Sequence, residues 1–313
     1  MKSILSLAIL VASAGCAASP RYWIAYVGEE ETGSRDDPES RPGRNTEIYI
    51  IDENGQNPRR VTHHPATDTE PSWSPDGRRL AFGSSRDGND EIYVIDLKTG
   101  AETRLTHDPG LDCQPAWSPD GRHIAFVSDR RAGNWDIYVM DPDGKNVRRL
   151  TSGAGLEAQP SWSPDSGRIA FVQNSPDDKG FRRLSLYWVE SSGNAQPVRM
   201  NVAEGINQWP AWRPDGNEVI FMSLRNENED IYAVDLWTGR ERRLTQAEQA
   251  EDMPSFSPDG RRLAFMIAGT EGKERFHDIV VTDAEGKSPR RLRAPGGHVF
   301  HPRWSGVPMI SPR

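Results

Sequence analysis

The chain has 313 residues, a formal net charge of −8 at neutral pH and 35% hydrophobic residues. Even after removal of a short N-terminal export signal, the chain would be long enough for one large domain, which would bury roughly three quarters of its unfolded surface. The acidic balance argues against nucleic acid as a partner, because the phosphates would be repelled.

Residues 1–15 have the composition of an export signal. They carry one early charge at Lys2, then an apolar stretch over residues 4–11, then small residues. A segment this short with small residues at its end is typical of a secretory signal peptide and not of a membrane-spanning helix. We therefore expect residues 1–15 to be removed on export.

The small residues Ala14 and Gly15 directly precede Cys16. This arrangement resembles a bacterial lipobox, in which Cys16 would be acylated and become the mature N-terminus. Ala17 at the next position would then favour sorting to the outer membrane. Ser13 stands where the motif more usually has Leu, so a plain cleaved signal with an incidental Cys16 stays open as the alternative.

The rest of the chain is organised around one repeated stretch, Pro-x-Trp-Ser-Pro-Asp-Gly. Near-copies follow one another at steps of 44, 45, 50, 44 and 48 residues, and the sixth copy is truncated. Periods of this size are typical of propellers and solenoids. The copies begin at Pro71, Pro115, Pro160, Pro210, Pro254 and Pro302.

Each period predicts four short strands, as the copy from Pro115 illustrates. A first strand over residues 115–118 leads into a Ser-Pro-Asp-Gly turn, and strands over 124–127, 137–140 and 148–151 follow. No segment has an apolar stripe of helical length. The middle strands are almost continuously apolar, so both faces of each small sheet need cover, which stacked blades provide. Arginine pairs on the outermost strand would protect an exposed edge.

The two ends of the chain complement each other. The N-terminal part lacks the first strand of a blade, and residues 302–305 supply the missing one. The sequence therefore predicts an all-β, six-bladed propeller over residues 22–305. Each blade would hold four antiparallel strands, the C-terminal strand would close the first blade, and residues 306–313 would form a tail.

The blocks resemble the TolB-type six-bladed propeller repeat, which the segment from Pro115 to Thr151 matches almost letter for letter. The resemblance extends over about residues 22 to 305 and implies the fold more strongly than the function. TolB proteins have an additional α/β domain ahead of the propeller and contact an outer-membrane lipoprotein through the propeller. This chain has no room for that additional domain, so the resemblance implies a relative that consists of the propeller alone.

Strand direction predicts which face lies near the membrane. Residues 16–21 would form a tether, and the five that follow Cys16 reach roughly 17 Å when extended. The chain would enter its first blade on the face of the tight turns, so that face would lie nearest the lipid. The loops on the opposite face differ most between copies, at residues 28–46 and 174–183. Such loops often carry recognition, although neutral drift remains the alternative.

Polar residues recur three residues before the proline in five of the six copies. Four acids and one amide, with further oxygen-bearing residues just behind, would form an electronegative funnel for a basic peptide or a hydrated cation. The alternative is that these side chains cap their own loops. The proposed funnel residues are Asp68, Glu70, Asp112, Gln114, Glu157, Gln159, Asn207 and Glu251, with Val299 at the sixth position.

Five of the seven histidines fall in three successive inter-blade loops. Imidazoles on adjacent loops can form a transition-metal site, and some lyases with related propellers hold a metal at this end. The family's loops also ordinarily contain such histidines, which is the competing interpretation. The candidates are His63, His64, His107, His298 and His301. The second cysteine, Cys113, is expected to be a small buried residue.

The chain lacks the nucleophile, zinc and phosphate-loop motifs of common enzymes. We therefore expect a non-enzymatic binding platform without a cofactor, monomeric, that recognises an envelope protein or peptide at the channel mouth. It would lie on the periplasmic side of the outer membrane, or be soluble in the periplasm if Cys16 is not acylated. The alternative is a metal-dependent lyase or hydrolase acting on an oligosaccharide or peptide at the histidine-bearing loops.

Overall fold

The computed structural model describes residues 22–32, 43–131, 133–153, 155–176, 182–225, 227–272, 274–295 and 297–308. Within these ranges every regular element is a β-strand. The described residues therefore offer no helix long and apolar enough to cross a membrane. The predicted all-β class is confirmed.

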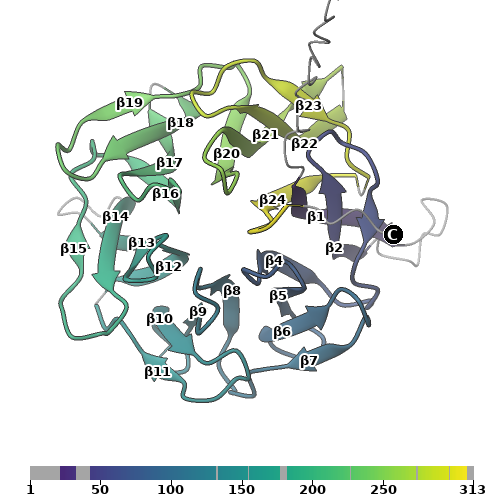
Figure 1. Ribbon diagram of the computed structural model, residues 1–313, viewed down its shortest axis with the longest axis vertical. Coiled ribbons are helices and arrows are strands. Elements are labelled where there is room, and N and C mark those ends of the chain that lie inside the picture. The colour runs from purple at the N-terminus through teal and green to yellow at the C-terminus, as the bar shows by residue number, and fades with distance from the viewer. Residues whose placement is uncertain are drawn as a thin grey trace, which may run out of the picture.

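Six four-stranded blades surround a central axis, each running from an inner first strand to an outer fourth strand (Figure 1). Blade 1 contains β24 (Val299–Trp304), β1 (Trp23–Thr32), β2 (Gly43–Asp52) and β3 (Arg59–Arg60). Blade 2 contains β4 (Asp68–Trp73), β5 (Arg79–Ser84), β6 (Glu91–Asp96) and β7 (Glu102–Arg104). Blade 3 contains β8 (Asp112–Trp117), β9 (Ile124–Ser128), β10 (Asp136–Met140) and β11 (Arg148–Arg149).

The second half of the ring repeats this order. Blade 4 contains β12 (Leu156–Trp162), β13 (Arg168–Pro176), β14 (Arg182–Glu190) and β15 (Val198–Arg199). Blade 5 contains β16 (Ile206–Trp212), β17 (Glu218–Arg225), β18 (Asn228–Asp235) and β19 (Glu241–Arg243). Blade 6 contains β20 (Ala250–Phe256), β21 (Arg262–Glu271), β22 (Glu274–Asp283) and β23 (Arg290–Leu292). One parallel pairing, Leu184 opposite Ile206, joins blades 4 and 5.

The hydrophobic core lies between neighbouring blades. Phe82 of blade 2, for example, packs in one cluster with Ala25 and Ile48 of blade 1. The second strand of each blade contributes one fully buried aromatic ring to these interfaces. The six rings belong to Tyr26, Phe82, Phe126, Phe171, Phe221 and Phe265. Both faces of the middle strands are thereby covered, which explains their continuous apolar sequences.

The ring closes through blade 1. Trp304 of β24 lies opposite Ile24 of β1, as Trp73 lies opposite Leu80 in blade 2. The Ser305 N–H also donates a hydrogen bond of 2.8 Å to the Trp23 carbonyl oxygen. The predicted closure by a C-terminal strand is confirmed.

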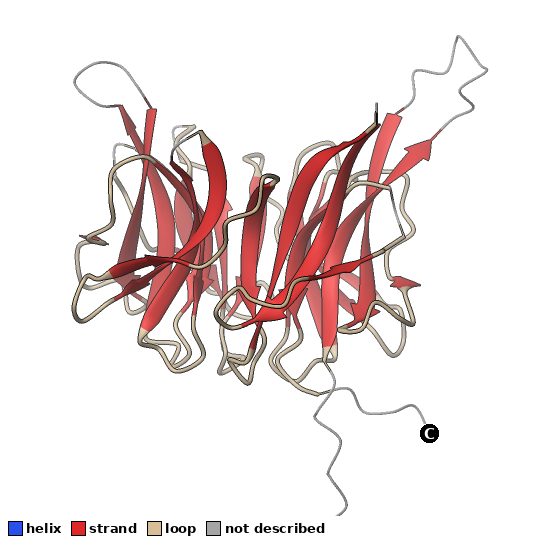
Figure 2. Ribbon diagram, turned by 90° about the horizontal axis from the view of Figure 1, so that it is seen from above, coloured by secondary structure: helices blue, strands red, loops and turns tan. Residues whose placement is uncertain are grey.

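The two faces of the ring differ. Tight turns occupy one face, which we call the turn face, and β1 begins there beside Ser305. On the opposite face, which we call the far face, the long hairpins β1–β2, β13–β14 and β21–β22 extend beyond the ring (Figure 2). The strand direction that the sequence predicted for the first blade is therefore the observed one.

Candidate functional site

Six residues with an unusual backbone conformation recur around the central axis, one in the first strand of each blade and directly before its proline. Each of the six has a positive φ, between 52° and 60°, although none is glycine. In every blade the pairing register of the first strand shifts at this point, which is the mark of a β-bulge. The bulge redirects the side chain, and we call this set the bulge ring: Glu70, Gln114, Gln159, Trp209, Met253 and His301.

Hydrogen bonds link the bulge ring from blade to blade. The Gln114 N–H donates to Glu70 Oε2 over 2.9 Å, and the Gln114 amide donates to Glu70 Oε1 over 3.0 Å. The Gln159 N–H donates to Gln114 Oε1, and the Trp209 N–H to Gln159 Oε1, both over 2.7 Å. Side chains thus satisfy backbone donors that the bulges free, and they hold the ring residues in place.

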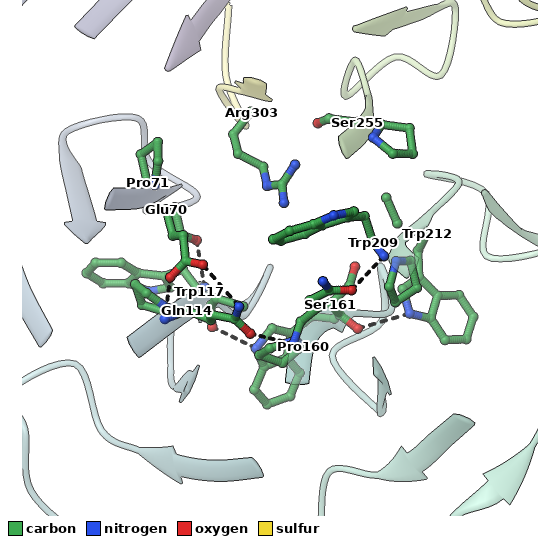
Figure 3. A pocket seen from close by; sticks show the side chains of 18 of the residues that line it. Glu70, Pro71, Gln114, Trp117, Pro160, Ser161, Trp209, Trp212, Ser255 and Arg303 are labelled. Carbon is green, nitrogen blue, oxygen red and sulfur yellow. Dashed lines mark hydrogen bonds between the residues drawn. The ribbon is translucent and has the colours of Figure 1, made fainter. Parts of the chain in front are cut away.

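A cavity of about 220 Å³ lies on the turn side of the bulge ring. Glu70 and Trp209 line it (Figure 3). Its lining also includes Pro119, which belongs to a tight turn. The walls include the residue that follows the proline in each first strand. In five blades this residue is small, whereas in blade 1 it is an arginine; the six are Ser72, Ala116, Ser161, Ala211, Ser255 and Arg303.

Arg303 projects into the middle of this cavity, between Glu70 and Trp209 (Figure 3). Burial lowers its pKa to about 10, so the guanidinium remains charged at neutral pH. Burial also raises the pKa of Glu70 to about 7 and that of Asp252 to about 7. The cavity therefore holds one permanent positive charge and, at Glu70, one carboxyl group that titrates near neutrality; Asp252 does not line the cavity but acts electrostatically on Arg303.

His301 completes one side of the bulge ring. Burial lowers its pKa to about 3, which makes the imidazole neutral at physiological pH. Its ring lies edge-on to the Trp209 indole with 4.8 Å between centroids, and Nε2 is 4.0 Å from Glu70 Oε1. Neither imidazole nitrogen has a hydrogen-bond partner among the described residues. His301 and Trp209 thus form an aromatic and uncharged side of the bulge ring.

The structure corrects the expectation for most of the proposed funnel. Only Glu70, Gln114 and Gln159 line the cavity. The other five are at most 4% exposed, as is Val299 at the sixth position, so their side chains do not form an open mouth. These five are Asp68, Asp112, Glu157, Asn207 and Glu251.

Two of the buried acids serve as anchors within their own blades, through arginine side chains and not through the loop caps that the alternative interpretation named. Asp68 accepts two hydrogen bonds from Arg86, at 3.1 and 3.0 Å. Asp112 accepts the same pair from Arg130, at 3.0 and 2.8 Å. Side chains of a regular strand point alternately to its two sides, but the bulge between these acids and the proline breaks this alternation. Counting back from the proline therefore predicts the wrong side for the acids.

These arginines were missed at the sequence level. Arg86 lies over the Tyr93 ring at 4.4 Å, Arg130 over Tyr138 at 4.9 Å, and Arg225 of blade 5 occupies the same place. A repeated Ser-x-Arg at the end of the second strand was the available signal, at residues 84–86, 128–130 and 223–225.

The structure does not gather the candidate histidines. His63 and His107 are exposed, and His64 Nδ1 accepts a hydrogen bond from the Ala66 N–H. His298 Nδ1 lies 2.8 Å from Nδ1 of His277, and His301 belongs to the bulge ring. Across the described ranges, no group of three or more His, Cys, Asp or Glu side chains is arranged to hold a metal.

Of the two cysteines, Cys113 belongs to the described residues. Cys16 and the predicted tether lie outside the described residues. Cys113 is a half-buried free thiol on β8, and burial raises its pKa. A raised pKa disfavours the reactive thiolate, in keeping with a packing role.

Comparisons with known proteins agree with the observed fold. The sequence model described as TolB beta propeller domain matches residues 71–187 and 191–307. The crystal structure of TolB from Acinetobacter baumannii is 27% identical with a TM-score of 0.74, covering 92% of this chain and 67% of that one. The sequence matches no curated protein.

More distant structures share the fold alone. A putative TolB from Agrobacterium tumefaciens is 20% identical with a TM-score of 0.67, and the match covers 89% of this chain and 90% of that one. An oligogalacturonate lyase in complex with manganese is 16% identical with a TM-score of 0.54, and the match covers 85% and 72%.

Proposed function

The chain belongs to the TolB beta propeller family, and from this membership and the axial cavity we propose that it is a non-enzymatic binding platform of the bacterial cell envelope. Membership supports a binding role in the periplasm in general terms. The proposed ligand is a protein or peptide partner, and the proposed site is the axial cavity with its bulge ring. The platform would act as a monomer.

One observation supports this site above others. The axial cavity brings together a cation, two amides and an indole from different blades, at Arg303, Gln114, Gln159 and Trp209. Binding sites in proteins typically combine a concave apolar wall with a few convergent polar groups. The ring structure fixes these groups before a ligand arrives, which reduces the entropy lost on binding.

We propose that the protein is exported and held at the outer membrane through an acylated Cys16. The five residues between Cys16 and Tyr22 span roughly 17 Å at most. The turn face would then lie near the lipid, with space for an extended segment of a partner to reach the axial cavity. Without acylation the platform would be soluble in the periplasm.

The enzymatic alternative receives no support from the described residues. Its five candidate histidines lie at separate places, as described above. The manganese of the oligogalacturonate lyase belongs to that protein, and at 16% identity the likeness is one of fold.

Site-specific crosslinking in intact cells tests the proposed site. A photoreactive residue at Ala116 would report on the axial cavity, one at Leu156 on the far face, and one at the exposed Lys98 on the outer turns. We expect one defined adduct from Ala116 and none from Lys98. An adduct from Leu156 alone would move the site to the far face. Absence of any adduct at Ala116 and Leu156 would contradict the platform.

A further inference from the structure

Arg303 is the one long cationic side chain at a position that five blades fill with serine or alanine. We propose that the axial cavity is a carboxylate-binding site in which the Arg303 guanidinium holds the carboxylate of the ligand. This inference deepens the proposed function and rests on it. It names the chemical group that the partner presents.

The guanidinium has donors to spare. Its recorded hydrogen bond runs from Nη1 to the Pro302 carbonyl oxygen, over 3.2 Å. Among the described residues, no carboxylate forms an ion pair with Arg303. Arg86 and Arg130, by contrast, both pair with buried acids. Glu70 and Asp252 attract the half-buried guanidinium at longer range, so a ligand carboxylate would add the hydrogen bonds that these acids do not form with it.

The nearest acids of the protein are already engaged by other donors. Both Glu70 oxygens accept hydrogen bonds from Gln114. The Asp252 carboxyl accepts the Met253 N–H over 2.7 Å. Among the described residues, neither acid forms a hydrogen bond or an ion pair with Arg303. The Nε and Nη2 donors of Arg303 remain available for a ligand.

The backbone of Arg303 is held firmly, so the guanidinium is presented from a fixed base. Its carbonyl oxygen accepts the Trp73 Nε1–H over 3.0 Å. In the sheet it lies opposite Ala25 of β1, which is fully buried. Such preorganisation favours binding because less freedom is lost.

The size of the cavity limits what can enter. Its volume of about 220 Å³ is small against the size of a folded domain. That space suits a carboxylate with one or two residues attached, and not a folded domain. The indole of Trp209 and the prolines of the inner strands offer apolar contact to the adjoining side chain. A peptide C-terminus, an internal acidic side chain and a small free acid share this chemistry.

Ligand-observed NMR titration of the full-length protein tests the proposal. The probes are N-acetyl-Ala-Ala with a free C-terminus, its C-terminal amide, N-acetylglutamic acid α-amide and acetate. We expect the acids to bind and the dipeptide amide to bind roughly 10- to 100-fold more weakly, because a hydrogen-bonded charge is lost. The acid that binds tightest then identifies the source as a peptide terminus, a side chain or a free ion.

Variants connect the binding to the guanidinium. Arg303→Gln should weaken the acid probes by the same roughly 10- to 100-fold, and Arg303→Lys should be intermediate because lysine keeps the charge without the planar fork. Arg122→Gln removes an exposed arginine of the turn face and serves as the matched control. Circular dichroism melting of Arg303→Lys shows whether the fold is kept, and that variant carries the test if Arg303→Gln does not fold.

Equal binding of acid and amide, or unchanged binding by a folded Arg303 variant, would overturn the proposal. The same holds if no acid probe binds the native protein at about 10 mM, which corresponds to a negligible affinity. Partner crosslinking from Ala116 separates this failure from a wider one. An adduct that persists in a folded Arg303 variant would leave the platform standing without the carboxylate.

Discussion

The indole N–H of Trp73 donates a hydrogen bond of 3.0 Å to the carbonyl oxygen of Arg303, 230 residues further along the chain. The same contact recurs between neighbouring blades, as from Trp212 to the Ser161 carbonyl and from Trp304 to that of Ser255. In blade 1 it fixes the residue that carries the cavity's cation. One interaction therefore links the closing strand of blade 1 to blade 2 and holds the backbone of the residue that carries the cavity's cation.

Truncation of the closing tryptophan should destabilise the ring as much as truncation of an internal one. Trp304 and Trp212 are 6% and 7% exposed, and each donates one inter-blade hydrogen bond. We expect Trp304→Ala and Trp212→Ala each to lower the free energy of unfolding by about 3–5 kcal/mol. Urea denaturation measures both. A much smaller loss for Trp304→Ala would mean that β24 is only loosely attached.

Two equivalent acids should respond differently to neutralisation. Arg86 would retain Glu102 as a partner after Asp68→Asn, as Arg225 retains Glu241 in blade 5, where Asn207 replaces the acid. Arg130 has no second acid partner among the described residues. We expect a loss of about 1 kcal/mol or less for Asp68→Asn and about 2–4 kcal/mol for Asp112→Asn.

Chemical denaturation measures these losses, and partner crosslinking from Ala116 provides the second readout. Neither substitution should change the crosslinking, because both acids are buried away from the axial cavity. Equal losses in stability would contradict the role assigned to Glu102. Loss of crosslinking in a stable Asp68→Asn variant would return these acids to the binding surface.

The buried carboxyl of Glu157 should make stability fall as pH rises. Burial raises its pKa from 4.5 to about 7 in the folded protein. Its contribution is therefore fully present below pH 4.5 and is lost as pH rises through 7. We expect Glu157→Gln to match the native protein near pH 4.5 and to gain about 1–3 kcal/mol over it above pH 7.

Denaturation curves across this pH window measure the difference. Glu190→Gln, at an exposed position, is the matched control and should give a constant difference. If the difference between Glu157→Gln and the native protein does not change with pH, the raised pKa is refuted.

Two turn glycines with similar backbone angles should differ in their tolerance of alanine. Gly144 and Gly100 have φ values of +81° and +73°. A Cβ at Gly144 would lie 2.5 Å from the Leu105 carbonyl oxygen in the neighbouring blade, whereas a Cβ at Gly100 would have no heavy atom within 4 Å beyond its own residue and its two chain neighbours. We expect Gly144→Ala to cost about 2–4 kcal/mol and Gly100→Ala about 1 kcal/mol. Thermal melting compares them, and similar costs would argue against close blade packing on the turn face.

Much of the fold was predictable because it is written in local patterns. Turn residues at fixed offsets and short apolar runs specify strands without long-range information. The incomplete sets of strands at the two ends predicted that Trp304 would complete the blade begun at Ile24, and it does. The sequence also contains the signal that Arg303 stands at a repeat position where the other five copies have serine or alanine.

The directions in which the side chains of the candidate site point were harder to predict from the sequence. Asp68 and Glu70 stand two residues apart, and both were expected at the channel mouth. The structure buries Asp68 in its blade and turns Glu70 into the cavity. A positive φ at Glu70 causes the difference, and the sequence before a proline does not announce such a bulge.

The sequence by itself determined the repeat, the four-strand blade and the means of closure, because these depend on turn chemistry and on apolar runs of strand length. Only the tertiary structure decided that six bulges converge, that side chains at the bulges link blade to blade, and that Arg303 and Trp209 line one cavity. Those relationships join residues from different blades. They exist only once the ring has closed and brought the inner strands around one axis.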